Sequence, residues 1–153
     1  ISKNTVENYL DLLSKVFIVY RMGAYSTNLR KEVSKSSKWY FYDNGIRNAI
    51  INDFRLLSLR NDIGPLWENY LISERIKRNS YDGKNVQYFF WRNYNQQEVD
   101  LIELENGQLS AYEFKYSPTK KVKAPAAFST AYPKASFVTI SKDNYLGWID
   151  PKD

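Results

Sequence analysis

The sequence predicts an α/β fold, and this prediction rests on the order of its elements. From residue 65 onward, segments follow one another as helix, three strands, helix and strand. Ahead of them, a helix, a strand, a basic loop and a second strand are typical of the closing half of a winged-helix unit. The chain has 153 residues, 43% of them hydrophobic, which is enough for one core and a small lobe. We therefore predict a winged-helix-like lobe over residues 1–55 and an α/β domain over residues 56–153.

The predicted lobe begins with an amphipathic helix. Val6, Leu10 and Leu13 recur at helical spacing, and Ser2 is suited to cap the helix. A polar, basic stretch next to Lys38 then separates two strand-like runs, as a wing would. The lobe is assigned a helix at 2–17, a strand at 17–22, a loop at 23–37 with Arg30, Lys31 and Lys35, a strand at 38–42 and a short helix at 46–52.

The second domain is punctuated by glycine and proline. Gly64-Pro65 opens a helix after a linker, Asp82-Gly83 marks a turn, and Pro118 ends a strand. Between these signals the apolar periodicity changes from helical to alternating. The domain is assigned a linker at 53–63, a helix at 65–79, strands at 86–91, 98–105 and 109–116, a helix at 122–131 and a strand at 136–140.

The strongest local signal is the Asn-Gly pair at residues 106–107, which predicts a two-residue β-hairpin turn. Such a turn places Asp100 directly opposite Glu113, and Glu98 opposite Lys115. Because strand side chains alternate between faces, all four charges are expected on one face of the sheet. A single bulge in the hairpin would break this register.

Two carboxylates placed opposite each other repel, so a cation is expected to offset Asp100 and Glu113. Mg²⁺ and Mn²⁺ suit this role, because they prefer oxygen ligands and keep part of their water shell. Lys115 is expected to orient or deprotonate a water molecule, or to stabilise negative charge as it develops. The alternative is a plain surface ladder, with Glu98–Lys115 as an exposed salt bridge.

The composition excludes several kinds of site. The chain has no Cys and no His, which removes disulfides, thiolate and imidazole metal ligands, and histidine acid–base catalysis. A net charge of +5 permits a polyanionic partner such as DNA. The sequence contains no signal peptide and no apolar run that could span a membrane. We therefore expect a cytoplasmic protein without a membrane partner.

The spacing of Asp100 and Glu113-Phe114-Lys115 resembles the signature of the restriction-endonuclease-like, or PD-(D/E)XK, nucleases. Nearly the whole chain resembles the domain of uncharacterised function at the C-terminus of many prokaryotic AAA-type ATPases. The stretches that carry this resemblance are Thr5-Val6, Tyr9-Leu10, Leu13, Lys38 through Gly45, Gly64 through Glu68, Trp91-Arg92, Glu98 through Asp100 and Glu113 through Lys115.

The resemblance implies a restriction-endonuclease-like α-β-β-β-α-β core and a set of site residues. Glu68 takes the place of the first-helix acid, and the implied metal ligands for Mg²⁺ or Mn²⁺ are Asp100, Glu113 and Glu68. The same three acids and Lys115 are the implied catalytic residues. The proline that often precedes the central aspartate is replaced by Val99. A complete motif implies competence and not a demonstrated reaction.

Other charged residues have two interpretations each. Arg92 is a candidate for phosphate contact or for a salt bridge with Glu98, and Glu74 is an alternative acid on the 65–79 helix. The lysines that follow Lys115 are candidates for holding a nucleic-acid backbone, or for an ordinary solvated loop. These lysines are Lys120, Lys121 and Lys123.

The leading functional hypothesis is a DNA-directed domain of an ATPase that hydrolyses phosphodiester bonds with Mg²⁺. The alternative is a non-catalytic interaction or DNA-binding module that regulates the ATPase. The sequence contains no phosphate-binding Gly-x4-Gly-Lys-Ser/Thr loop, so the ATPase domain is expected upstream in the same polypeptide. The start at Ile1, within a helix entrance, agrees with a piece of a longer protein.

Overall fold

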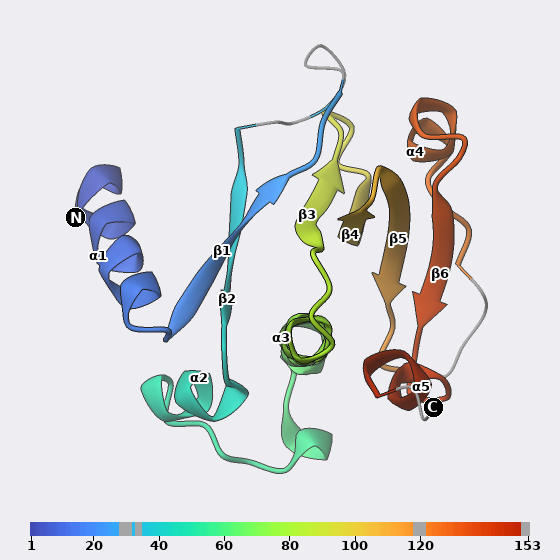
Figure 1. Ribbon diagram of the computed structural model, residues 1–153. Coiled ribbons are helices and arrows are strands. Elements are labelled where there is room, and N and C mark those ends of the chain that lie inside the picture. The colour runs from blue at the N-terminus through green and yellow to red at the C-terminus, as the bar shows by residue number, and fades with distance from the viewer. Residues whose placement is uncertain (28–31, 33–34, 118–121, 151–153) are drawn as a thin grey trace.

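A single six-stranded mixed sheet organises the protein, as the computed structural model shows (Figure 1). The strand order is β2-β1-β3-β4-β5-β6. The structure describes residues 1–27, 32, 35–117 and 122–150. Its elements are α1 (Lys3–Lys15), β1 (Val19–Ala24), β2 (Ser37–Phe41), α2 (Asn44–Ile50), the 3-10 helix η1 (Leu57–Leu59), α3 (Ile63–Tyr81), β3 (Gln87–Arg92), β4 (Glu98–Glu105), β5 (Gln108–Phe114), α4 (Ala126–Ala131), β6 (Ser136–Ile140) and α5 (Tyr145–Ile149).

The predicted α/β class is confirmed, and the element order of the second part follows the prediction with small shifts at the ends. Helix α4 begins at Ala126 and not near residue 122, with Pro125 at its N-cap. Helix α2 begins at Asn44, because the Asp43 side chain accepts hydrogen bonds from the N–H groups of Gly45 and Ile46. The helix α5 was not predicted, because five residues are too few for a periodic pattern.

The two N-terminal strands belong to the same sheet as the strands of the second domain. Strand β1 pairs antiparallel with β2 and parallel with β3, where Gly23 and Ala24 face Phe89 and Phe90. The predicted wing falls partly outside the described residues, and Arg30 and Lys31 lie in that part. Lys38 lies within β2, in agreement with the strand predicted at 38–42.

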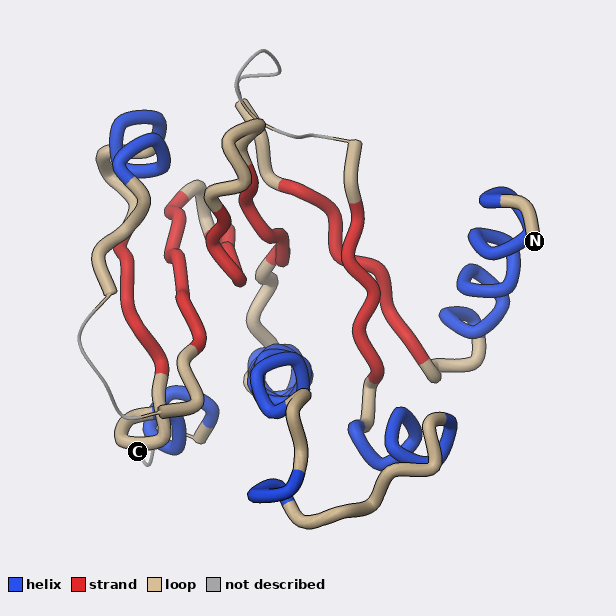
Figure 2. The backbone as a smooth tube through the Cα atoms, turned by 180° about the vertical axis from the view of Figure 1, so that it is seen from behind, coloured by secondary structure: helices blue, strands red, loops and turns tan. Residues whose placement is uncertain are grey.

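The helices take different positions around the sheet. Helix α1 lies beyond β1 and β2 at one edge, whereas α4 and α5 lie near opposite ends of β5 and β6 (Figure 1). Seen from behind, α1 again stands clear of α3, α4 and α5 (Figure 2). None of its residues is buried. No helix within the described ranges has the length and apolar character that crossing a bilayer would need.

Two hydrophobic clusters form the core. One contains residues of α3 and the sheet, among them Leu71, Ile72, Phe90 and Leu101. The other contains Phe128 of α4 and, from the sheet, Trp91, Val99, Ile102 and Ala111. Phe128 is 1% exposed, so even the short helix α4 is anchored by one fully buried ring.

A bulge in β4 decides which core each residue of that strand enters. Phe89 of β3 pairs with Ile102, but Trp91 pairs with Val99, so β4 contains one extra residue at this point. Val99 and Ile102 consequently belong to the same core cluster, although they are three residues apart. Leu101 joins the other cluster, and Asp100 is the next residue of the bulged segment.

A buried ion pair fixes α3 and α5 against the sheet. Glu103 is 6% exposed as a residue. Its carboxylate accepts hydrogen bonds from Arg75 Nε at 2.8 Å and from Asn79 Nδ2 at 3.0 Å. Arg75 also donates to the Trp148 carbonyl at 2.7 Å, and its guanidinium lies 4.8 Å from the Trp148 ring centroid. The single charge on Glu103 therefore holds two helices.

We expect Glu103→Ala to destabilise the fold strongly. The substitution leaves the Arg75 guanidinium and the Asn79 amide without their acceptor in a dry environment, which costs about 3–5 kcal/mol in the free energy of unfolding. Glu105→Ala, two residues along the same strand, is the matched control and should cost less than about 1 kcal/mol. Urea unfolding followed by circular dichroism measures both, and equal losses would show that the buried ion pair does not hold the helices.

Candidate functional site

The carboxylates singled out in the sequence meet at one end of the sheet. The β4–β5 ladder pairs Leu101 with Tyr112 and Glu105 with Gln108. This is the register expected from a two-residue turn at Asn106-Gly107, where both residues have positive φ. The bulge in β4 lies in its pairing with β3, so it leaves the hairpin register intact.

Asp100 is the most strongly perturbed acid of this cluster. Its Oδ2 accepts a hydrogen bond from the Phe114 N–H at 2.8 Å, just beyond the last pair of the β4–β5 ladder. Burial raises the pKa of the Asp100 carboxyl to about 7, and the negative charges of Glu68 and Glu113 add to this rise. The Phe114 N–H and the Lys38 ammonium act in the opposite direction. Asp100 thus lies within electrostatic reach of both other acids.

Lys115 pairs with Glu113 and not with Glu98, which corrects the expected cross-strand pair. Its Nζ lies 2.7 Å from Glu113 Oε1. The hydrogen bond to Glu113 raises the pKa of Lys115, with further contributions from the charges of Asp100 and Glu68. Strand β5 ends at Phe114, so Lys115 lies one residue past it. Its side chain can therefore bend back to Glu113, two residues earlier in the chain.

Glu98 turns to two other cations. Arg92 Nε donates to Glu98 Oε2 at 2.6 Å, so the salt-bridge interpretation of Arg92 describes its contacts. The other oxygen, Oε1, is in short contact with Lys38 Nζ. The Arg92 and Lys38 charged groups lie over the same Phe90 ring, at 5.7 and 5.3 Å from its centroid. The charge of Glu98 is thus offset by side chains of β2 and β3, which lie on the side of β4 away from β5.

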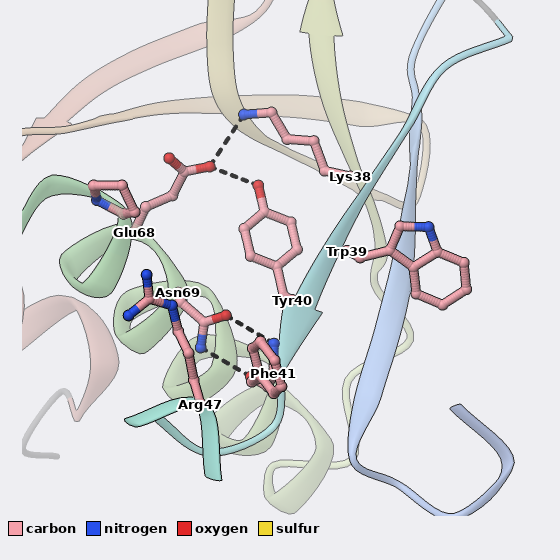
Figure 3. Close-up of a pocket in the computed structure, with 8 residues that line it drawn as sticks. Lys38, Trp39, Tyr40, Phe41, Arg47, Glu68 and Asn69 are labelled. Carbon is pink, nitrogen blue, oxygen red and sulfur yellow. Dashed lines mark hydrogen bonds and ion pairs between the residues drawn. The ribbon is translucent and has the colours of Figure 1, made fainter. Parts of the chain in front are cut away.

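Glu68 reaches the cluster from α3, where Lys38 and Tyr40 of β2 contact it (Figure 3). Lys38 Nζ lies 3.1 Å from Glu68 Oε1, and the Tyr40 hydroxyl donates to the same oxygen at 2.6 Å. Burial opposes the charge on Lys38, but Glu68 and Glu98 outweigh it and raise the pKa of the ammonium. Burial and the Glu68 charge raise the pKa of the Tyr40 hydroxyl, which stays protonated and donates.

A side-chain amide fixes the distance between α3 and β2. Asn69, which is 5% exposed, accepts from the Phe41 N–H at 2.8 Å and donates to the Phe41 carbonyl at 2.9 Å. The Ser73 hydroxyl, one helical turn further, donates to the same carbonyl at 2.9 Å. Because Glu68 precedes Asn69, this pairing holds the Glu68 carboxylate opposite the Tyr40 hydroxyl.

An open pocket of about 330 Å³ adjoins the part of the cluster in which Lys38 pairs with Glu68. Lys38, Tyr40 and Glu68 line one side of it, and Arg47 and Pro65 line the rest together with residues of β2 and α3. Trp39 points away from Glu68, as alternation along β2 requires (Figure 3). The pocket gives water and small ions access to Glu68.

The remaining sequence candidates are Glu74 and three lysines. Glu74 pairs with Lys77 at 2.8 Å on a half-exposed part of α3 and does not join the other acids. Lys123 is exposed. Lys120 and Lys121 lie outside the described residues. Lys38 and Tyr40 were missed as site residues, and the only sequence signal was their spacing of two within a strand-like run, which puts both on one face.

The donor set suits a hard divalent cation only in part. Among the described residues, no three acidic side chains are grouped so that they could hold a metal ion by themselves. Asp100 and Glu113 offer carboxylate oxygens, and burial together with the charges of Glu68 and Glu113 raises the pKa of Asp100. Mg²⁺ commonly uses one or two carboxylates and completes its shell with water and substrate phosphate. Asp100 and Glu113 are thus the two carboxylates that such an ion would use, with Lys115 on Glu113, while Glu68 is engaged by Lys38 and Tyr40.

Comparison with known proteins divides the chain into two matched parts. Residues 63–148 match the family described as Domain of unknown function (DUF4143), and residues 1–57 match Domain of unknown function (DUF8612). The match over residues 63–148 contains α3, the hairpin strands and thus Glu68, Asp100, Glu113 and Lys115, whereas Lys38 lies in the match over residues 1–57.

The chain also resembles curated proteins of mycobacteria. It is 26% identical over 124 residues to an uncharacterized protein of Mycobacterium bovis and, to the same degree, to an uncharacterized protein of Mycobacterium tuberculosis. Each match covers 80% of this chain and 27% of the relative. The chain therefore spans about a quarter of the length of these relatives. No solved structure gives a significant match.

We expect Asp100→Asn to change how stability depends on pH. The Asp100 pKa is about 7 in the folded protein and near its ordinary value of 3.8 in the unfolded chain. The unfolded chain therefore releases this proton first, and the wild-type protein loses stability as pH rises from about 4 to about 7. Asparagine does not ionise and can still accept from Phe114. At pH 8 the variant should be more stable by up to about 4 kcal/mol, while at pH 4 the two should be similar.

Urea unfolding across pH 4–8 measures this difference. Glu105→Gln is the matched control, since it removes a carboxylate from the same strand outside the cluster. Parallel stability curves for the wild type and Asp100→Asn would show that Asp100 is not strained by Glu68 and Glu113.

Proposed function

This chain belongs to the family described as Domain of unknown function (DUF4143), and we propose that it is a Mg²⁺- or Mn²⁺-dependent hydrolase of DNA phosphodiester bonds. The observation that carries the proposal is the position of Asp100. Its carboxylate is held by the Phe114 N–H within electrostatic reach of Glu68 and Glu113, and the Lys115 ammonium lies on Glu113. Such a concentration of like charge lowers the stability of the fold, and it is typical of functional sites.

The same proposal includes the finer fold. The order α3-β3-β4-β5-α4-β6 and the central β4–β5 hairpin support a restriction-endonuclease-like core, with Glu68 on its first helix. Residues 1–57 add β1 and β2 to the edge of that core. The winged-helix-like character of this first part stays a prediction.

The proposed roles follow from the contacts. Asp100 and Glu113 would hold the metal ion, which would supply positive charge to the scissile phosphate and acidify a water molecule. The Lys115 ammonium, 2.7 Å from Glu113, is placed to stabilise negative charge on the phosphate or to orient the attacking water. Glu68 lies within electrostatic reach of Asp100, and Lys38 and Tyr40 set its position.

Two cationic side chains, Arg92 beside Glu98 and Lys123 on the surface, would hold the DNA backbone. Arg92 is about one-third exposed while it pairs with Glu98, and Lys123 is exposed. The net charge of +5 favours a polyanion. An ATPase domain in the same polypeptide, which the sequence resemblance implies, would position the substrate. The isolated chain should therefore cleave DNA slowly, since positioning supplies a large part of the rate of such reactions.

A second candidate function is a non-catalytic interaction module that regulates the ATPase. It is favoured by one observation: most of the large apolar side chains that the described residues expose lie before residue 60. They are Ile1, Val6, Tyr9, Leu12, Val16, Phe17, Ile46, Ile50, Ile51, Phe54, Leu56, Leu57 and Leu59. Such a concentration is typical of a protein–protein contact surface.

We expect wild-type protein to bind Mn²⁺ weakly without DNA and Asp100→Asn to lose this binding. Two carboxylates form an incomplete shell, so calorimetry should give a dissociation constant of about 0.1 mM or weaker. Glu105→Gln should bind as the wild type does. Undiminished binding by Asp100→Asn would place the metal, if one binds, away from the proposed site.

We expect DNA binding to depend steeply on salt. With about four to six phosphate contacts, raising salt from about 50 to about 200 mM should weaken binding by roughly 10²- to 10³-fold. Fluorescence anisotropy with a labelled duplex measures this. A chain that binds no DNA even at low salt would favour the interaction module.

A further inference from the structure

Lys38 makes contacts that a bound cation would make. Its Nζ lies between two carboxylates from different elements, 3.1 Å from Glu68 Oε1 on α3 and in short contact with Glu98 Oε1 on β4. The Lys38 side chain is only 20% exposed. A lysine ammonium is a compact point charge, so it can occupy a position between two acids much as a small cation does.

Both carboxylates are also held by partners other than Lys38. The Tyr40 hydroxyl donates to Glu68 at 2.6 Å, and Arg92 Nε donates to Glu98 Oε2 at 2.6 Å. The Glu98 oxygen that faces Lys38 is therefore a different atom from the one that Arg92 holds. If the ammonium were removed, Glu68 and Glu98 would keep these second contacts and would face each other across the vacated position.

That position is accessible from solvent. Lys38 and Glu68 both line the open pocket of about 330 Å³ beside the cluster (Figure 3). An ion could approach Glu68 from this pocket. Oxygen ligands from two carboxylates, completed by water, are the surroundings that Mn²⁺ and Mg²⁺ prefer.

We propose that the Lys38 ammonium is a built-in counter-ion that occupies the place of a second divalent ion between Glu68 and Glu98. This inference rests on the proposed function, in which Asp100 and Glu113 take the first ion. Sites for phosphoryl transfer often hold two metal ions close together. Here the chain supplies one of the two positive charges from β2, so the site takes a single metal ion, and Lys38 is a positioning residue for Glu68.

The test counts Mn²⁺ ions bound per chain, by calorimetry and by electron paramagnetic resonance. Wild-type chain should bind one ion, and Lys38→Ala should bind two, because the ion replaces the lost charge. Lys38→Arg keeps the charge and should bind one ion. Lys84→Ala, which removes a charge from an exposed lysine, is the matched control and should also bind one.

A double variant assigns the second ion. Lys38→Ala with Glu98→Gln should bind one ion again, because Glu98 is then lost as a ligand. If Lys38→Ala unfolds without metal, added Mn²⁺ should restore its folded circular dichroism spectrum. A chain that stays unfolded with Mn²⁺ would overturn the inference, as would two ions bound to the double variant.

The outcomes separate this inference from the proposed function. One ion in both the wild type and Lys38→Ala overturns the counter-ion role and leaves the proposed metal site at Asp100 and Glu113 intact. No ion in the wild type but one in Lys38→Ala sustains the counter-ion role and removes the proposed function. No ion in either, or two in the wild type, overturns the inference.

Discussion

The repulsion among four carboxylates is the constraint around which one end of this sheet is built. Glu68, Glu98, Asp100 and Glu113 come from a helix and two strands, and each is at least partly shielded from water. Water alone would not offset their mutual repulsion there, because the effective dielectric constant falls with burial. Every neighbouring contact can be understood as a way of supplying positive charge or hydrogen-bond donors to these four groups.

The donors arrive from across the chain. Lys38 and Tyr40 come from β2, Arg92 from β3 and Lys115 from the end of β5. Asp100 alone receives no direct cation and accepts only a backbone N–H in this group of contacts. Burial, together with the charges of Glu68 and Glu113, raises its pKa to about 7. The unmet charge is therefore concentrated beside Glu113, where an oxygen-seeking metal ion would be most favoured.

The scaffold holds these charges with few, well-buried polar contacts. Asn69 matches both the N–H and the carbonyl of Phe41, which ties α3 to the edge strand β2. Glu103 binds Arg75 and Asn79 and thereby ties α3 to the middle of the sheet. Helix α3 is thus fixed at two places, and the position of Glu68 follows. The first sixty residues contribute to the site through Lys38 and Tyr40, and they also carry most of the exposed apolar surface.

The sequence by itself determined the α/β class, the order of helices and strands along the second part of the chain and the register of the β4–β5 hairpin. These features are local: an Asn-Gly turn fixes the pairing of residues a few positions away, and so Asp100 and Glu113 could be placed at the same end of neighbouring strands. Only the tertiary structure decided the partners of the charges. Lys38 contacts Glu68 and Glu98, which are 30 and 60 residues away, because β1 pairs in parallel with β3 and brings β2 with it. Pairing between distant strands depends on how whole elements pack. A long side chain such as that of Lys115 can then pair with any of several acids within its reach. No local pattern could therefore reveal those contacts.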